Sequence, residues 1–293
     1  MPDPGVALST IASGVLLGGM LALAALGLSI VLGVMRLVNL AHGDLAVCCT
    51  YVVTTVMASL GVPLLIGLLI MLPLAFCFGA LLQLALFDRA LRLGPTAPLL
   101  VTFGLSVMIE NLLQQVYTAN TRGVPAGSLD VAALHFGGLV LPWLSALKLV
   151  LAVGVIGGLS MLLRLTAWGR RVRATSDDVV IARLQGIRVR PLFASVTGIA
   201  IGAAALAGTL NAVTTGIDPT LGALTLIFAF EAVIIGGLGS LWGTLLGGML
   251  IGVTQVVVAQ VSVSYAILAS QLLFLVVLAV RPQGMFGNPQ VVG

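Results

Sequence analysis

The sequence predicts an all-α polytopic membrane protein with about nine transmembrane helices, and eight to ten are compatible with it. Two observations predict this fold class. Hydrophobic residues make up 60% of the 293 residues and charged residues only 8%, whereas a soluble domain carries about 25% charged residues. In addition, no charged residue lies between Asp44 and Asp88 or between Glu231 and Arg281. Each of these gaps is long enough for two helices of about 20 residues.

The apolar stretches give the candidate spans in chain order. They cover 9–33, 39–59, 63–87, 97–118, 142–164, 192–214, 221–238, 240–259 and 263–280. Turn-forming residues separate several of them, as at Gly61-Val62-Pro63, Gly94-Pro95 and Asp218-Pro219. Each stretch is continuously apolar and does not alternate, which is typical of membrane helices and not of barrel strands. We expect a single transmembrane domain over residues 1–293.

Basic residues indicate the orientation. The segment from Arg164 to Arg190 holds seven arginines and two aspartates, a net charge of +5 against +4 for the whole chain. Arg89 and Arg92 lie in the other basic loop. Because basic loops stay on the cytoplasmic side, we expect both loops and the tail after Arg281 in the cytoplasm. The chain would then lie in a bacterial inner membrane, with loop 119–141 and the N-terminus on the periplasmic side.

The basic segment 166–190 contains a short predicted helix. Thr175 and Ser176 precede two acids, Asp177 and Asp178, which is typical of a hydroxyl cap followed by an acidic first turn. Gly186 is a typical helix terminator. About ten helical residues are expected between the two signals. They form either an incidental turn in a basic loop, or a helix that lies parallel to the membrane and docks into a cytoplasmic partner.

Polar residues also interrupt an apolar stretch between the first two spans. Arg36 is followed by Asn39-Leu40-Ala41-His42-Gly43-Asp44, which predicts a break between helices in which Asn39 or His42 caps exposed backbone. Irregular backbone inside a membrane is tolerated only where protein buries it or where it lines water. Two interpretations remain open. The segment is a cap with an Arg36–Asp44 pair at the cytoplasmic interface, or it forms part of a conduit or its gate.

A second polar cluster lies in the span 97–118. Ser106, Glu110 and Gln114 are spaced four residues apart and predict one stripe on a helix, with Asn111 and Gln115 beside it. We expect the stripe to face protein or a transport path, because a glutamate facing lipid is costly. Hydrogen bonds between helices are the simpler explanation, and contact with a transported solute is the alternative.

Glycines recur at short intervals near the end of the chain. Repeated small residues let membrane helices approach closely, and we assign helix packing to Gly236, Gly237, Gly239, Gly243 and Gly247. The Gly236–Ser240 run is no nucleotide loop, because no lysine follows it and no strand precedes it. No catalytic triad, paired catalytic carboxylates or metal-ligand spacing is found. Catalytic and metal sites are therefore not expected, and the three cysteines are interpreted as small apolar residues.

Five ordered motifs resemble one known family. They are Asn39-Leu-Ala-His-Gly-Asp44, Thr102-Phe-Gly-Leu-Ser106 with Glu110-Asn111, Gly169-Arg-Arg-Val-Arg-Ala174 with Ala182-Arg-Leu-Gln-Gly186, Gly236-Gly-Leu-Gly-Ser240, and Arg281-Pro-Gln-Gly-Met-Phe-Gly287. Together they are similar to the permeases of branched-chain amino acid ABC transporters, most of all the LivH-type subunit. Asp44 departs from the pattern, because the family often has glutamate there; the charge is kept.

The resemblance implies an ABC importer permease fold and a set of partners. These are a second, LivM-like permease subunit, two ATPase subunits that hold ATP and magnesium, and a periplasmic solute-binding protein. Membrane lipid would surround the chain, which would bind no cofactor and no nucleic acid itself. Asn39, His42, Gly43, Asp44, Ser106, Glu110, Asn111 and Gln114 would line the path or its gate. Asp178, Ala182, Arg183 and Gly186 would couple the permease to an ATPase subunit.

The function that follows is transport and not catalysis. The first expectation is an inner-membrane permease of an ATP-driven importer for branched-chain or other amino acids. Members of the same family for urea, short amides or aromatic acids are alternatives. An ion-coupled secondary transporter is a further alternative, favoured by the intramembrane residues Glu110 and Glu231 but lacking clear inverted repeats.

Overall fold

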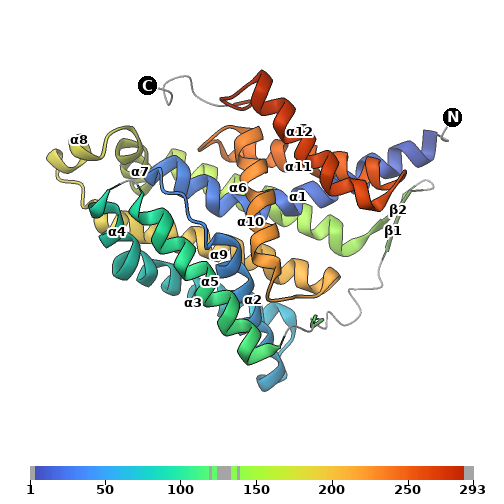
Figure 1. Ribbon diagram of the computed structural model, residues 1–293, viewed down its shortest axis with the longest axis horizontal. Helices are drawn as coiled ribbons and strands as arrows, with labels where there is room; N and C mark the ends of the chain where they lie inside the picture. Colours follow the sequence, from blue (N-terminus) through green and yellow to red (C-terminus); the bar gives the residue numbers. More distant parts are fainter. Residues whose placement is uncertain (1–3, 95, 119–120, 124–132, 137–138, 287–293) are drawn as a thin grey trace.

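The chain forms a helical bundle with one short hairpin, seen in a computed structural model that describes residues 4–94, 96–118, 121–123, 133–136 and 139–286 (Figure 1). The long helices are α1 (Pro4–Met35), α2 (His42–Leu60), α3 (Leu64–Leu82), α5 (Ala97–Tyr117), α6 (Trp143–Leu165), α9 (Val189–Thr215), α10 (Leu221–Gly236), α11 (Leu241–Ala259) and α12 (Ala266–Val280). Shorter helices are the π-helix η1 (Gln83–Phe87), α4 (Asp88–Leu93), α7 (Ala167–Asp177), α8 (Val179–Leu184) and the 3-10 turn η3 (Val263–Tyr265).

Eight of the described helices are long and apolar enough to cross a membrane, with α3 continuing through η1 and α4 to Leu93 as one of them. The count lies within the expected eight to ten spans, and one of the nine candidate segments falls short. The predicted span 221–238 corresponds to α10, which has only 16 residues. At 1.5 Å per residue it is about 24 Å long, shorter than the roughly 30 Å hydrocarbon core.

The core lies along α1 and α9, which occupy the middle of the bundle (Figure 1). The most apolar stretch of α1 is 78% buried and that of α9 is 83% buried, against 22% for α3, α5 and α6 and 11% for α12. The outer helices therefore present apolar side chains outward, as expected for a chain surrounded by lipid.

Close backbone contact holds α1 against α11. A β-carbon on Gly18 would lie 2.3 Å from the Cα of Met249, and one on Gly252 would lie 2.4 Å from the carbonyl oxygen of Gly14. Real side chains do not fit such gaps, so these positions need glycine. Hydroxyl groups add a direct link, because Thr244 donates to Ser29 at 2.9 Å. The glycines of α1 take part in the same packing, which the sequence analysis did not assign.

The glycines after α10 have two different roles. Gly236, Gly243 and Gly247 pack α10 against α11, since a β-carbon on any of them would lie within 2.3 Å of backbone atoms across the contact. Gly237 and Gly239 do not lie in either helix. They form the turn between them with φ angles of +99° and +79°. The assignment of Gly237 to helix packing is therefore corrected to turn formation, whereas Gly239 also packs against α1, where a β-carbon on Gly33 would lie 2.7 Å from its Cα.

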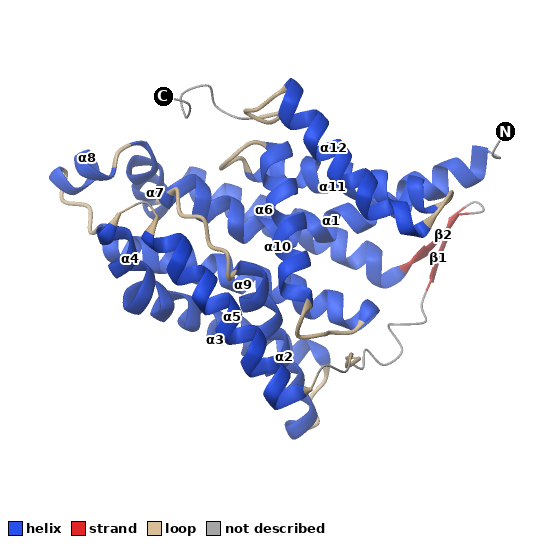
Figure 2. Cartoon of the chain, viewed as in Figure 1, coloured by secondary structure: helices blue, strands red, loops and turns tan. Residues whose placement is uncertain are grey.

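Two helices start part-way through the bundle. His42, the first residue of α2, contacts α1 at Ala24, which is about 16 Å before the end of α1 at Met35. The first turn of α10 in turn contacts the first turn of α2, where a β-carbon on Gly43 would lie 1.9 Å from the Gly222 carbonyl oxygen. The chain after Met35 therefore runs back along the bundle as irregular backbone before α2 begins (Figure 2). The predicted span 39–59 is found as α2, which is long and apolar enough to cross a membrane, although it starts inside the bundle.

The segment 166–190 forms two helices and not one. α7 begins at a cap in which the Thr166 hydroxyl accepts from the Gly169 N–H, and it extends through Thr175 and Ser176. The cap of α8 is Asp178, whose carboxylate accepts from the N–H groups of Val180 and Ile181. The predicted hydroxyl cap is therefore wrong, because Asp178 fills that role.

Gly186 ends α8 with a φ of +80°. The N–H of Gly186 bonds the Arg183 carbonyl and that of Ile187 bonds the Ala182 carbonyl, which is the Schellman arrangement of a helix end. The predicted terminator is confirmed. α7 and α8 lie together at one end of the bundle, called the α8 end below (Figure 1).

A hairpin lies at the opposite end. Strands β1 (Ala133–Phe136) and β2 (Leu139–Pro142) pair antiparallel, with Ala133 opposite Pro142. An all-α chain was predicted, so this short hairpin is an addition to it. The rest of the predicted loop 119–141 lies largely outside the described residues.

Candidate functional site

The break between α1 and α2 is held by its own side chains and by α5. The Asn39 side-chain oxygen accepts from the Ala41 N–H at 3.1 Å, and the Leu40 N–H donates to the Thr102 hydroxyl at 3.2 Å. Thr102 itself donates to the Pro98 carbonyl at 2.8 Å. Polar backbone at this depth is thus buried in protein, the condition under which it is stable in a membrane.

His42 anchors the start of α2 to α1. Its Nε2 lies 3.1 Å from the Ala24 carbonyl oxygen, which can only accept, so the imidazole donates from Nε2. The side chain is buried, and a β-carbon on Gly27 would lie 2.7 Å from the imidazole ring and 2.3 Å from the Ala200 carbonyl oxygen. The His42 side chain therefore packs between the middle parts of α1 and α9.

Asp44 joins three helices. Its carboxylate accepts from the Ser106 hydroxyl of α5 at 2.5 Å, and it contacts the backbone of Gly222 in α10, where a β-carbon would lie 1.8 Å from Oδ1. The expected pair with Arg36 is not what the structure shows. Arg36 ends α1 with a φ of +51° and is exposed, so the partner of Asp44 among the described residues is Ser106.

The amino ends of two helices adjoin this carboxylate. Asp44 lies in the first turn of α2 and touches the first turn of α10. Neither helix has a side-chain cap, since Ala41 and Thr220 form no capping hydrogen bond. The amino end of a helix carries partial positive charge and favours a nearby anion. The side chain of Asp44 thus supplies negative charge where two uncapped helix starts converge. We call Asn39, His42, Gly43, Asp44, Ser106 and Gly222 the helix-start junction.

The polar stripe of α5 continues outward from this junction. Ser106 reaches Asp44, and one and two turns further on Gln114 donates to Glu110 at 3.1 Å. Asn111 bonds its own helix at the Val107 carbonyl and is exposed, as is Gln115. The stripe therefore faces protein at its inner end and is open at its outer end in the isolated chain.

A network at the α8 end was missed by sequence reasoning. Arg190, at the start of α9, forms an ion pair with Asp88 at 2.9 Å. Gln83 lies between these elements, donating to Asp88 at 3.4 Å and accepting from Thr197 at 2.7 Å. The π-helical turn Gln83–Phe87 sits at the centre of this network, and such turns often occur at functional positions. Only the arrangement in space reveals it, because Gln83 and Asp88 are about 100 residues away in sequence from Arg190 and Thr197.

Lys148 is a further residue that nothing in the sequence singled out. It is a buried cation within α6 and donates to the Thr214 hydroxyl at 2.6 Å. Thr214 lies in the last turn of α9, where a positive charge interacts favourably with the helix dipole.

The four predicted coupling residues differ in their structural roles and in their exposure. Asp178 caps α8, Gly186 ends it and Arg183 is exposed. Ala182 is only 1% exposed and packs inside this chain. Its expected contact with a partner is therefore corrected, because no surface of its side chain is available. The exposed apolar residues are Val180, Ile181 and Leu184.

Glu231 lies away from the helix-start junction. It is 2% exposed within α10, and neither carboxylate oxygen has a hydrogen-bond partner among the described residues. Gln271 of α12 interacts with it without forming a hydrogen bond that meets normal geometry.

Replacing Glu231 by glutamine is expected to raise the melting temperature by about 2–4 °C, the shift that corresponds to roughly 1 kcal/mol. A buried carboxylate without partners is costly, and the amide removes the charge at equal size. Thermal unfolding in detergent, followed by size-exclusion or fluorescence, measures it. Glu231→Lys, the control of opposite charge, is expected to unfold earlier. A Glu231→Gln protein that is as unstable as Glu231→Lys would show that the carboxylate has a stabilising partner.

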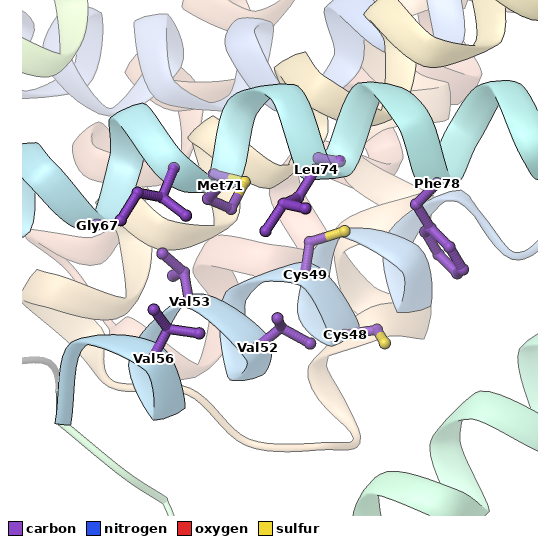
Figure 3. Close-up of a pocket in the computed structure, with 11 residues that line it drawn as sticks. Cys48, Cys49, Val52, Val53, Val56, Gly67, Met71, Leu74 and Phe78 are labelled. Atoms are coloured by element: carbon purple, nitrogen blue, oxygen red, sulfur yellow. The ribbon is translucent and has the colours of Figure 1, made fainter. Parts of the chain in front are cut away.

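Two cavities of different character flank α2. One, of about 300 Å³, lies between α2 and α3 and is lined by apolar residues and Cys48 and Cys49 (Figure 3). The other, of about 220 Å³, lies among α1, α2, α9, α10 and α11 and includes polar side chains. The three cysteines are free, and the described residues contain no group of three histidine, cysteine or acidic side chains that could hold a metal ion.

Comparison with known proteins decides the family. Residues 10–280 match the family described as "Branched-chain amino acid transport system / permease component". The chain belongs to this family. The branched-chain amino acid permease protein BraD of Pseudomonas aeruginosa is 28% identical over 305 residues, covering 99% of each chain. The permease protein LivH of Escherichia coli K12 is 27% identical, covering 95% of each chain.

Two further similarities extend the comparison. The fructose import permease protein FrcC of Rhizobium meliloti is 32% identical over 169 residues, which cover 53% of this chain and 46% of FrcC. Among solved structures, PsaBC from Streptococcus pneumoniae in complex with Fab aligns over 97% of this chain and 95% of its own, with 15% identity and a TM-score of 0.46. As a member of this permease family, the chain is a multi-pass membrane transport component.

Proposed function

We propose that this permease is the membrane subunit of an ATP-driven importer for branched-chain or related amino acids, and that it forms the path together with a second, LivM-like permease. The proposal of a shared path rests on one observation, the polar stripe of α5. Its exposed residues Asn111 and Gln115 lie on a helix that is only 22% buried. Polar side chains facing lipid are unfavourable, so a second permease or water covers this face.

The helix-start junction supports the same path from inside. Asp44 and Ser106 lie at the inner end of the stripe and touch α10 through Gly222. Two helices that start within the bundle are typical of transport proteins, where their ends contact polar solutes. The roles of Asn39, His42, Gly43 and Asp44 are to hold these helix starts together and to act as a gate next to the path.

Coupling to ATP hydrolysis is assigned to the α8 end. Val180, Ile181 and Leu184 expose apolar side chains on a helix capped at both ends. A soluble ATPase subunit that covers them removes apolar surface from water, which is favourable. ATP and magnesium belong to that subunit. This assignment places the α8 end in the cytoplasm of a bacterial inner membrane and the hairpin end on the periplasmic side.

Substrate delivery is assigned to a periplasmic solute-binding protein. The relatives BraD and LivH are named for branched-chain amino acid transport, and FrcC is named for fructose import. The coverage by BraD and LivH is nearly complete, whereas FrcC matches about half of each chain, so an amino acid is the substrate we propose. Urea, short amides and aromatic acids are the alternatives within the family.

Uptake of radiolabelled leucine into proteoliposomes tests the proposal. The chain is purified with the permease, ATPase and solute-binding proteins encoded beside it and reconstituted with ATP inside or outside the vesicles. We expect accumulation that requires ATP on the side of the ATPase subunits and is unaffected by ionophores. Excess valine or isoleucine should compete.

The ion-coupled alternative makes the opposite prediction. Buried Glu231 favours it, since carboxylates within membranes often carry protons in transporters. Uptake that collapses with an ionophore and continues without ATP would overturn our proposal. Uptake that depends on ATP but is inhibited only by urea or an aromatic acid would keep the importer and change its substrate.

A further inference from the structure

A cavity within this single chain lies beside the helix-start junction. The cavity of about 220 Å³ is bounded by five helices and by the turn before α10. Its polar lining residues are Thr50, Asn211, Thr215, Thr225 and Gln255. At about 30 Å³ for each water, the volume equals roughly seven waters, the size range of a small aliphatic amino acid. We call this space the α9–α10 cavity.

The apolar walls of the cavity suit a branched hydrocarbon. Leu17 and Met20 of α1, Val47 of α2 and Leu224 and Phe228 of α10 line it. No acidic or basic side chain is among its lining residues. A solute with net charge would lose its hydration without a counter-charge, which is costly, so a solute without net charge fits this space better.

Asn211 supplies a polar group that is free to bind. It lies on α9, lines the cavity and forms no side-chain hydrogen bond with the described residues. The hydroxyls of Thr50 and Thr225, in contrast, each donate to a carbonyl of their own helix. The amide of Asn211 can both donate and accept, which is what binding of an ammonium or a carboxylate group requires.

The ends of two helices adjoin the same space. Thr215 and Gly216 at the carboxyl end of α9 line it, as do Leu221 and Leu224 in the first turn of α10. The first end carries partial negative charge and the second partial positive charge. Lys148 already donates to Thr214 at the first end, and Asp44 already contacts Gly222 at the second, so the two ends do not favour a solute with net charge. A zwitterion, with one group of each sign, can lie between them while its side chain fills the apolar part.

We propose that the α9–α10 cavity binds one zwitterionic amino acid with an aliphatic side chain. The inference rests on the proposed amino-acid transport and adds a site within this permease, separate from the face of α5. It assigns Asn211 to hold a charged group of the solute. Leu224 and its apolar neighbours would select the side chain.

The turn before α10 forms part of the cavity wall, through Gly216 and Ile217. Ile217 in that turn exchanges two backbone hydrogen bonds with Arg122, at 2.8 and 2.9 Å, and its carbonyl also accepts from the Tyr51 hydroxyl at 3.4 Å. Tyr51 stacks on Tyr117, and Arg122 lies 5.2 Å above that second ring. These contacts fix the position of this part of the cavity wall.

Binding to the receptor-free complex tests the inference. The permeases and ATPase subunits are placed in lipid nanodiscs without the solute-binding protein, and radiolabelled leucine binding is measured at equilibrium. We expect saturable binding of one leucine for each copy of this chain. Leucinamide, which lacks the carboxylate, and 4-methylpentanoate, which lacks the ammonium group, should compete at least about tenfold less well than leucine, because each leaves one charged contact unmade.

Variants locate the site. Asn211→Leu removes the free amide at similar size, and Leu224→Phe adds bulk to the cavity; each should weaken leucine binding by about tenfold or more. Leu74→Phe is the matched control, since it makes the same substitution in the apolar cavity between α2 and α3. It should leave binding unchanged.

Three outcomes would overturn the site. One is no saturable leucine binding in a receptor-free complex that still performs ATP-driven uptake when the receptor is added. Another is leucine binding that Asn211→Leu and Leu224→Phe leave intact. The third is competition by both analogues as strong as that of unlabelled leucine. Failure of ATP-driven uptake itself would count against the proposed function, and the binding measurement would still decide whether the cavity holds an amino acid.

Discussion

Replacing Asp44 by alanine is expected to lower ATP-driven uptake by at least about tenfold, while the protein still inserts and assembles. A tenfold effect corresponds to about 1.4 kcal/mol, which is within the range for one hydrogen bond to a charged group. Asp44 is the side chain that links α2 to Ser106 of α5 and to the start of α10. Its loss leaves two uncapped helix ends facing each other without the anion between them.

Insertion is expected to survive because the bundle is held elsewhere. Close backbone contacts away from Asp44 join α1 to α11 and α10 to α11, through Gly18, Gly252, Gly236 and Gly243. None of these involves Asp44. Uptake in proteoliposomes, with protein amount and ATPase assembly measured on the same preparation, separates a transport defect from a folding defect.

Two further variants show whether the effect of Asp44→Ala comes from the lost charge and whether it is specific to this position. Asp44→Asn keeps an oxygen that accepts from Ser106 and loses the charge, so it reports the charge alone. Ser59→Ala is the control on the same helix, because its hydroxyl is exposed and bonds only the Val56 carbonyl. Normal uptake by Asp44→Ala would remove the helix-start junction from the transport path. An uptake loss of equal size in Ser59→Ala would show that α2 tolerates no change.

The sequence was informative about where helices lie along the chain. Charge-free runs predicted the long helices, and Gly61 and Gly94 mark ends that the structure confirms with φ angles of +63° and +126°. Gly186 was read correctly because a Schellman end is set by local backbone geometry. Features that depend on a few neighbouring residues are therefore available from the sequence.

The depth of a helix start is not local, and the sequence did not show it. α2 has 19 mostly apolar residues, enough for a full span, yet it begins beside Ala24 in the middle of α1. Hydropathy measures length and composition, so a helix that starts inside the bundle resembles any other span. The same limit hid the partner of Asp44, since Ser106 is 62 residues away and is brought close only by the packing of α5.

Competing signals explain the errors near α8. Thr175, Ser176 and Asp178 are all good caps, and the choice between them depends on where the preceding helix stops. Because Thr166 caps α7 early, that helix runs on through both hydroxyl residues, and Asp178 takes the next start. A small residue such as Ala182 serves equally in a partner contact or in internal packing. Ala182 is only 1% exposed, and this burial shows that it serves internal packing.

Replacing Leu184 by aspartate is expected to lower ATP-driven uptake by at least about tenfold through loss of the ATPase subunits. Leu184 is 83% exposed, so the change costs this chain no internal contact. It does place a charge in the apolar face formed with Val180 and Ile181. A charge buried there against a partner would be unpaired, which is costly. Co-purification of the ATPase subunits and uptake are the two measurements.

The path from α8 into the membrane explains why docking matters for transport. α8 ends at Leu184, Gly186 forms the turn, and α9 begins at Val189. The next residue, Arg190, is paired with Asp88, so a displacement of α8 reaches α9 and α4 within a few residues. A partner changes the state of the permease only through contacts that differ between its own states, and α8 offers exposed apolar surface at the start of the most buried helix.

Leu184→Met is the matched control, because it keeps an apolar side chain of similar size at the same position. It should retain both the ATPase subunits and uptake. Gly186→Leu should reduce uptake as Leu184→Asp does, since a leucine at a φ of +80° is strained and would misplace α8, whereas Gly186→Asn, which tolerates this conformation, should be milder. If Leu184→Asp retains its ATPase subunits and wild-type uptake, coupling runs through another surface at this end, because the exposed apolar face of α8 would then have no partner.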